Sequence, residues 1–191
     1  AGCLGSGASG GSSSDSSGGS QNATILPAPV QGNPQANVTV AVYEDFACPH
    51  CRTYNLDVLP QVESEFVESG RIRYEHYDMP VVSEVSWRAA SGARAVQDRA
   101  GDGPFFTYAR KLYENQQSLG PDTYASLANE MDLDGQAVRE AAVSQRYEAT
   151  VSANRERGLD NGVEGTPTIF VNGSSVEPTF EAISSAIELA Q

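Results

Sequence analysis

Lysine is almost absent from this 191-residue chain. Lys111 is the only one, and Lys and Arg together number 12 against 25 Asp and Glu, giving a formal net charge of −13. Without clustered basic residues, the chain lacks the means to bind nucleic acid by counterion release. It is also poorly suited to docking on an anionic membrane. The acid excess predicts a halophilic protein that stays soluble in strong salt, with an ordinary acidic secreted protein as the alternative.

Long apolar runs are absent too, and cysteine is scarce. No stretch of about 18 apolar residues is present, so the sequence predicts no membrane-spanning helix. Cys3, Cys48 and Cys51 are the only cysteines, and an odd number in an exported protein indicates that one is unpaired or modified. The length allows one domain with a sizeable core.

The first 37 residues are expected to form a flexible tether. Residues 1–20 contain seven Gly and eight Ser, and prolines follow up to residue 34. Such a composition buries too little surface to offset the entropy of ordering. Ala1-Gly2-Cys3 resembles the end of a lipobox, which predicts lipid attachment at Cys3; a stray tail cysteine is the alternative.

The remaining chain, 38–190, has the pattern of one α/β domain. Strands are expected at 38–43, 71–77 and 166–171, with an Asn172-Gly173 hairpin turn and a partner strand at 175–176. The expected helices are at 49–69 (kinked at Pro60), 83–100, 104–117, 121–131, 135–157 (with a break near Gln145) and 178–190. A parallel crossover needs only one helix, so the surplus indicates a helical subdomain inserted at about 82–145.

Cys48-Pro49-His50-Cys51 carries the chemistry. A C-x-x-C pair is either half of a zinc site or a redox dithiol, and the other candidate ligands, Cys3 and His76, are isolated. We therefore expect no metal and no cofactor. A purely structural disulfide would close too short a loop to stabilise the fold much.

The position of the pair favours redox chemistry. Cys48 falls where a strand ends and a helix begins, with Pro49 at the first helical position. Free N–H groups and the helix dipole stabilise a thiolate there, and His50 can add positive charge or a hydrogen bond. We expect Cys48 to be the attacking thiolate and Cys51 the buried resolving cysteine.

Two motifs together resemble a known family. Glu44-Asp45-Phe46-Ala47-Cys48-Pro49-His50-Cys51, a helical block, and then Gly165-Thr166-Pro167-Thr168 resemble the DsbA-like branch of the thioredoxin superfamily. The resemblance covers about 38–190 and implies a thioredoxin-like fold with a helical insertion. It also implies a cis Pro167 beside the dithiol, with Thr166 facing substrate, and a DsbB-like membrane reoxidant as partner. The alternative for Pro167 is a trans proline opening an edge strand.

One position departs from that family. Thioredoxin-like proteins often carry a buried acid six residues before the first active-site cysteine, and Val42 stands there. Glu44 and Asp45 are candidates for proton transfer with Cys51, or else a solvated pair at the strand end. His76 is expected on the strand surface, and Trp87 in the core rather than in a substrate groove.

These features predict an extracytoplasmic thiol–disulfide oxidoreductase, a haloarchaeal-type exported lipoprotein anchored to the outer face of the cell membrane. Through Cys48 and Cys51 it would introduce disulfides into exported proteins, with protein thiols as substrates and no nucleic-acid partner. A reductase or isomerase of the same fold is one alternative. A lipid-tethered binding module with a vestigial dithiol is the other.

Overall fold

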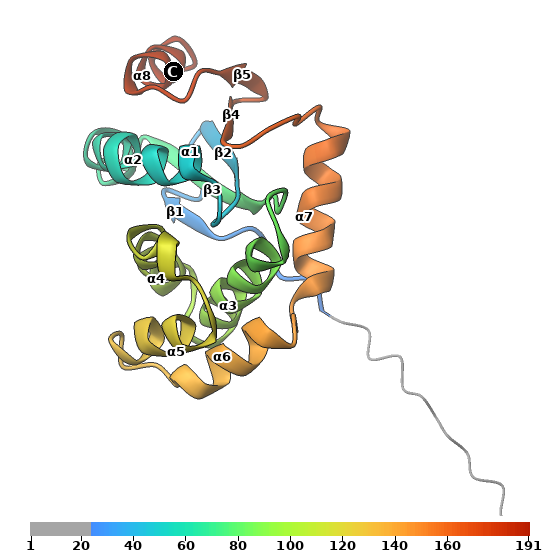
Figure 1. Ribbon diagram of the computed structural model, residues 1–191. Helices are drawn as coiled ribbons and strands as arrows, with labels where there is room; N and C mark the ends of the chain where they lie inside the picture. Colours follow the sequence, from blue (N-terminus) through green and yellow to red (C-terminus); the bar gives the residue numbers. More distant parts are fainter. Residues whose placement is uncertain (1–23) are drawn as a thin grey trace, which may run out of the picture.

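Five strands form one mixed sheet at the centre of the molecule (Figure 1). The computed structural model describes residues 24–191. The spatial order of the strands is β1-β3-β2-β4-β5, with β2 and β3 parallel and every other neighbouring pair antiparallel. The strands are β1 (Val30–Gly32), β2 (Val38–Glu44), β3 (Ile72–Asp78), β4 (Thr168–Val171) and β5 (Ser174–Val176).

One face of the sheet packs against the helix that follows β2 and against the C-terminal helix. The first is irregular: α1 (Pro49–Thr53) and α2 (Leu59–Val62) alternate with π-helical turns at Tyr54–Val58 and Glu63–Val67. Pro60, where the sequence predicted a kink, lies in the short α segment between those turns. Together with α8 (Phe180–Leu189), these elements cover the inward side chains of β2 and β3. The buried members of this cluster include Val40, Val42, Ile72, Phe66, Ile183 and Ile187.

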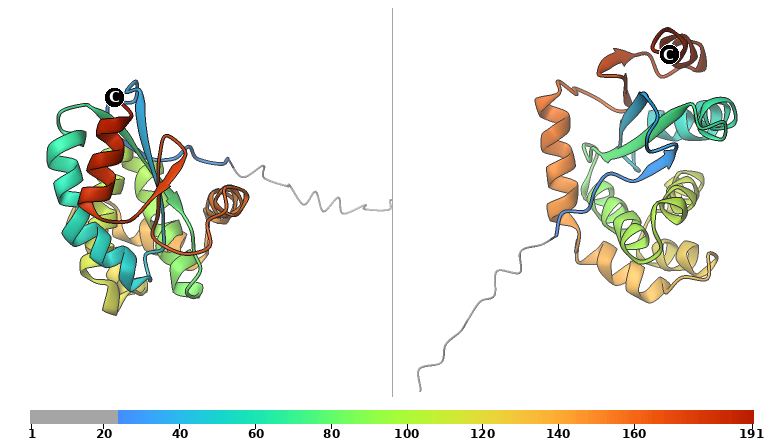
Figure 2. Two further views of the ribbon diagram at one scale, coloured as in Figure 1. Left: turned by 90° about the horizontal axis from the view of Figure 1, so that it is seen from above. Right: turned by 180° about the vertical axis from the view of Figure 1, so that it is seen from behind.

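The predicted helical insertion is present. It comprises α3 (Glu84–Ala100), α4 (Asp102–Glu114), a 3₁₀ turn at Gln116–Ser118, α5 (Pro121–Asn129) and α6 (Gly135–Val143). The chain breaks at Gln145, which has a positive φ of 51°, and continues as α7 (Glu148–Asp160). Figure 2 shows α7 standing beside the sheet, away from α2 and α8. Gly158 brings α7 close to the sheet, because a Cβ there would lie 2.9 Å from the sulfur of Met79.

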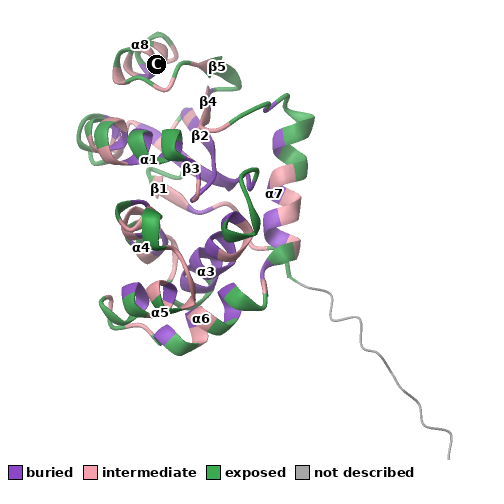
Figure 3. Ribbon diagram, in the orientation of Figure 1, coloured by how far each residue is buried: buried purple, intermediate pink, exposed green. Residues whose placement is uncertain are grey.

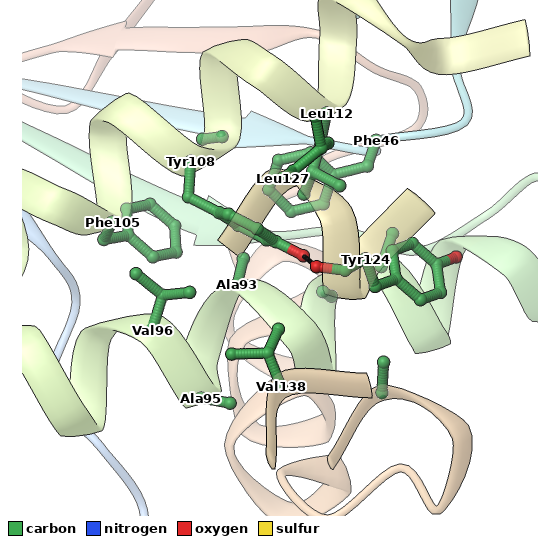
Figure 4. Close-up of a cluster of buried hydrophobic side chains, with 14 of the residues drawn as sticks. Phe46, Ala93, Ala95, Val96, Phe105, Tyr108, Leu112, Tyr124, Leu127 and Val138 are labelled. Atoms are coloured by element: carbon green, nitrogen blue, oxygen red, sulfur yellow. Dashed lines mark hydrogen bonds between the residues drawn. The ribbon is translucent and has the colours of Figure 1, made fainter. Parts of the chain in front are cut away.

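The insertion has its own hydrophobic core, which reaches the dithiol. Tyr108, at its centre, is fully buried and donates its hydroxyl to the backbone oxygen of Tyr124 at 3.0 Å (Figure 4). Cys48 and Cys51 belong to this cluster rather than to the cluster below the sheet. Buried positions are concentrated in β2, β3 and α3, whereas residues 81–85 between β3 and α3 are exposed (Figure 3).

The sequence predicted a flexible tether over residues 1–37, but the structure shows ordered contacts in the part of it that is described, residues 24–37. Residues 30–32 form β1, antiparallel to β3, and the backbone N–H of Leu26 donates to the Thr150 hydroxyl at 3.0 Å. This part of the tether prediction is wrong, because pairing with β3 and contacts with the insertion hold the segment in place. The prediction for residues 1–23, including lipid attachment at Cys3, lies outside the described residues.

Candidate functional site: a dithiol at a helix N-terminus

The two cysteines lie in the first turn of α1. Cys48 is the N-cap residue, with extended backbone angles, and Pro49 follows at the first helical position. Both residues are free cysteines. Cys48 keeps 6% of its surface exposed, whereas Cys51, one turn further along, is completely buried. Both cysteines are therefore buried and differ only slightly in access, so the assignment of Cys48 as the accessible nucleophile stays a prediction.

The two thiols differ more in acidity than in access. A hydrogen bond from Cys51 is the main cause that lowers the pKa of Cys48 to about 5, and contacts with Thr166 and the backbone of residues 50 and 51 lower it further, against the effect of burial. Burial raises the pKa of Cys51 far above the usual range of a thiol, and the charge of Glu44 raises it further. At neutral pH Cys48 is therefore a thiolate and Cys51 a thiol.

Thr166 and Pro167 lie against the outer sulfur. The Thr166–Pro167 peptide bond is cis, and the Cys48 sulfur lies 3.5 Å from the backbone oxygen of Thr166. The loop before β4 is therefore in direct contact with the group that would attack a substrate. The Asn172-Gly173 turn that follows β4 has positive φ at both residues, 47° and 84°, as a type I′ turn requires.

His50 and Pro49 are both exposed. The contact that His50 makes with the thiolate comes from its backbone, which contributes to lowering the pKa of Cys48. At the second helical position this N–H has no partner inside the helix and is free to face the sulfur. The sequence had pointed to the imidazole, whereas the structure shows the backbone.

Asp45 is buried and is fully occupied by backbone donors. Its carboxylate accepts N–H groups from Ala47 at 2.8 Å and from Val81 and Val82 at 2.8 and 2.9 Å. Its own N–H lies 3.5 Å from the Cys51 sulfur. Asp45 therefore ties the loop after β3 to the dithiol, and the idea of a solvated acid pair at the strand end is wrong.

Glu44 is the second buried acid, 3% exposed. Asn55, one turn after Cys51 in the helix, donates its side-chain amide to Glu44 and also to the backbone oxygen of Cys51 at 3.1 Å. Val42 points into the hydrophobic cluster, and Glu44 lies two residues further along the same face of β2. The buried acid is thus displaced by one inward position, toward the dithiol.

His76 was expected on the surface, and that expectation is wrong. It is 2% exposed, and its two ring nitrogens lie 3.2 Å from Glu44 and 3.0 Å from Asp78. Asp78 in turn accepts a hydrogen bond from Arg94 of α3 at 2.7 Å, and Arg94 is fully buried. The reason is register: Val42 pairs with His76 and Glu44 with Asp78, so these side chains share the inward face.

The insertion contributes two features that the sequence did not reveal. Gln116 donates to the backbone oxygens of Phe46 and Cys48, both at 2.9 Å, and so holds the turn that carries the dithiol.

The second feature is a groove of about 530 Å³ that opens beside the loop that Asp45 holds. Trp87 is half-buried at its edge, so the expectation of a core tryptophan is only partly right. The groove is lined by Pro80, Val81, Val82, Ser83, Glu84, Trp87, Gln145, Glu148 and Arg155.

The described part of the chain contains neither a metal-ligand cluster nor a membrane-spanning helix. Within residues 24–191, no group of three or more His, Cys, Asp or Glu side chains is placed to hold a metal ion. None of the helices described there is long and apolar enough to cross a membrane.

Known proteins resemble this chain over most of its length. The probable disulfide bond formation protein D of Bacillus cereus is 26% identical over 164 residues, 82% of this chain and 76% of that protein. Disulfide bond formation protein D of Bacillus subtilis is 24% identical over 86% of this chain and 78% of that protein. The Na(+)/H(+) antiporter NhaA 3 of Salinispora tropica is 31% identical over 160 residues, but these are only 24% of its length.

Solved structures agree with the fold. BdbD from Bacillus subtilis, in its oxidised form, superposes with a TM-score of 0.80 at 23% identity, covering 85% of this chain and 92% of that one. DsbA of Chlamydia trachomatis gives 0.76 at 22% identity, covering 84% and 90%. The family model described as thioredoxin matches residues 25–189. The chain therefore belongs to the thioredoxin family, as a DsbA-like thiol–disulfide oxidoreductase.

Proposed function

We propose that the protein is an oxidase that introduces disulfides into exported proteins. The observation that carries this proposal is the contrast between the two sulfur atoms, a stabilised thiolate at Cys48 and a buried thiol at Cys51. A disulfide is a strong oxidant when its reduced form is specially stabilised, and a thiolate held at a helix N-terminus provides that stabilisation. The relatives named as disulfide bond formation proteins support the same direction.

The reaction transfers two electrons from a substrate dithiol to the pair. A substrate thiolate attacks the Cys48 sulfur, a substrate–Cys48 disulfide forms, and Cys51 leaves with the electron pair of the broken S–S bond and takes up a proton. The second substrate thiolate then attacks the substrate sulfur of the mixed disulfide. Cys48 leaves as a thiolate, and the substrate departs with its own disulfide. The second proton released by the substrate goes to water.

Glu44, rather than Asp45, is the group that we assign to proton exchange with Cys51. The Asp45 carboxylate already accepts three backbone N–H groups. Glu44 has no backbone donor among its recorded partners and shares Asn55 with Cys51. Glu44 can therefore pass a proton to Cys51 transiently, returning to its charged form, without releasing a loop.

The groove beside Asp45 suits a segment of an unfolded substrate. Val81 and Val82, at its rim, are about half exposed, at 49% and 54%, and offer apolar surface on the loop that Asp45 links to the dithiol. Thr166 presents its backbone at the other side of Cys48. We assign protein thiols as substrates, an extracytoplasmic location, and a membrane protein as the reoxidant. Membrane attachment through Cys3 is checked by mass spectrometry of membrane-extracted protein, and an unmodified Cys3 there would contradict it.

The reduction potential of the Cys48–Cys51 couple tests the proposal. We expect a value of about −120 to −180 mV, nearer the oxidases and isomerases than the value of about −270 mV for thioredoxin. Equilibration with glutathione buffers at high salt measures it, with Lys111→Gln as a control variant remote from the pair. A potential near that of thioredoxin would identify a reductase and contradict the oxidase assignment.

A further inference from the structure

A buried histidine joins two carboxylates, one of which, Glu44, interacts with Cys51. Nδ1 of His76 lies 3.2 Å from one oxygen of Glu44, and Nε2 lies 3.0 Å from Asp78. All three side chains are at most 3% exposed. One proton on Nε2 serves Asp78, so the open question is whether the second proton resides on Nδ1 or on Glu44.

The partners on both sides favour the proton on His76. Asp78 is held ionised by Arg94, which donates to it at 2.7 Å and lowers its pKa against the effect of burial. A carboxylate behind an imidazole stabilises the imidazolium. On the other side, burial raises the pKa of Glu44, and the hydrogen bonds that it accepts from His76 and Asn55, together with the charge of His76, oppose that rise. With His76 protonated, the four charged groups Glu44, His76, Asp78 and Arg94 sum to zero.

Aromatic rings and a small set of titratable groups surround the charged Glu44–His76 pair. The rings of Phe46 and Phe105 lie 5.6 and 5.0 Å from the His76 ring, centroid to centroid, and cover it with apolar surface. The titratable groups that interact with the Glu44–His76 pair are Asp78, with Arg94 behind it, the two cysteines, and the buried tyrosines Tyr54, Tyr74 and Tyr113. Burial opposes a charged imidazole, but the hydrogen bonds and charges of Asp78 and Glu44 raise the pKa of His76.

We propose that His76 is a positioning residue for the redox reaction: its imidazolium keeps Glu44 charged beside Cys51, and that charge holds Cys51 in the thiol form while a substrate is attached to Cys48. The inference rests on the proposed oxidase function, because the role of His76 explains why the mixed disulfide is resolved by the second substrate thiol and not by Cys51. A Cys51 thiolate would attack Cys48 and return the substrate reduced. A Cys51 thiol leaves the mixed disulfide to the second thiol of the substrate.

The back reaction gives a direct measurement. Glutathione is attached to Cys48, and the release of glutathione by Cys51 is followed from pH 5 to pH 9. In His76→Gln the buried Glu44 loses its cation and becomes neutral, which removes a charge that raises the pKa of Cys51. A fall of one pH unit in that pKa gives tenfold more thiolate but a weaker nucleophile, so release should accelerate by about threefold at neutral pH.

The double variant separates electrostatics from packing. Glu44→Gln should accelerate release as His76→Gln does, and Glu44→Gln/His76→Gln should be no faster than Glu44→Gln alone. Loosened packing would add its effect in the double variant, so additive accelerations would overturn the proposal, as would an unchanged or slower His76→Gln. The glutathione assay runs whichever direction the enzyme takes in the cell. A reducing potential would therefore contradict the oxidase assignment without deciding the role of His76.

A second measurement needs no change in the core. The chain has two histidines, so ¹⁵N NMR of the imidazole rings resolves His76 from the exposed His50, which His50→Ala assigns. At pH 7 both ring nitrogens of His76 in the reduced protein should carry protons. A single protonated nitrogen on His76 at that pH would place the proton on Glu44 and overturn the proposal.

Discussion

The two sides of the dithiol are built from different materials. On the outer side, Cys48 accepts a hydrogen bond from the Cys51 thiol and otherwise faces backbone, with the free N–H groups at the start of α1 and the backbone oxygen of Thr166 beside it. On the inner side, Cys51 is buried, and the charge of Glu44, which shares the Asn55 amide with the backbone of Cys51, acts on its thiol. The same residue type thus becomes a nucleophile on one side and a protected thiol on the other, because the Cys51 hydrogen bond and backbone N–H groups stabilise one anion while burial and a negative charge oppose the other.

The largest expected effect is in a trapping experiment, in which one cysteine variant should accumulate mixed disulfides with substrate and the other should accumulate none. Cys51→Ser leaves the Cys48 thiolate free to form mixed disulfides that nothing inside the protein resolves, so substrates should accumulate on it. Cys48→Ser leaves only the buried, protonated Cys51 and should trap none. Non-reducing electrophoresis measures both, and equal trapping by the two variants would abolish the distinction.

Removing the buried Arg94 on the inner side should lower the free energy of unfolding. Arg94→Met leaves Asp78 buried without its guanidinium partner, and breaking a buried pair in this way costs about 3–5 kcal/mol of unfolding free energy. The matched control is Arg139→Met, whose partner Asp122 is 93% exposed, and it should cost about 0–1 kcal/mol. Urea unfolding at constant salt measures both, and equal losses would contradict a stabilising role for the buried pair.

Part of the inner side could have been predicted from the sequence. The strand at 38–43 alternates with buried positions, and extending the alternation from Val42 places Glu44 on the inward face. The same step from Tyr74 places His76 and Asp78 there. What the alternation cannot supply is the register that brings Glu44 opposite Asp78, because pairing between strands is a long-range property.

Other features had no local signal. Arg94 lies within a run of small residues in α3, and only the packing of three elements explains its burial. Gln116 follows a helix in an unremarkable polar stretch, yet reaches the dithiol turn across 68 residues. The strand β1 has only three residues and gains its order from β3. The outer side was easier to predict, since a helix that starts at the proline of C-P-H-C is a local feature.

The acidity of the outer sulfur should appear directly in its alkylation rate. The rate at Cys48 in the reduced protein follows the thiolate fraction, so it should reach half of its maximum near pH 5. The folded pKa is below the unfolded one, so this group stabilises the reduced fold fully above the unfolded value of about 8.5, and that stability is lost as the pH falls through 5. Half-maximal alkylation near pH 8.5 would remove the contrast with Cys51.

The smallest expected effect separates two parts of one residue. The backbone N–H of His50 faces the Cys48 sulfur, whereas its imidazole is exposed to solvent. His50→Ala keeps the N–H, and His50→Pro removes it. A hydrogen bond to a charged group contributes about 1.5–3 kcal/mol when buried, and less at a site that solvent reaches, so His50→Pro should raise the pKa of Cys48 by about one unit.

His50→Ala should raise that pKa by clearly less, and the couple should become more reducing in the same order, with the proline variant changed most. Alkylation profiles and glutathione equilibration measure the two quantities independently. Because proline at this position also restricts the backbone of Pro49, circular dichroism and the alkylation plateau should show that α1 is retained. If alanine and proline shift the pKa equally, the imidazole stabilises the thiolate, and the outer side of the dithiol depends on a side chain as the inner side does.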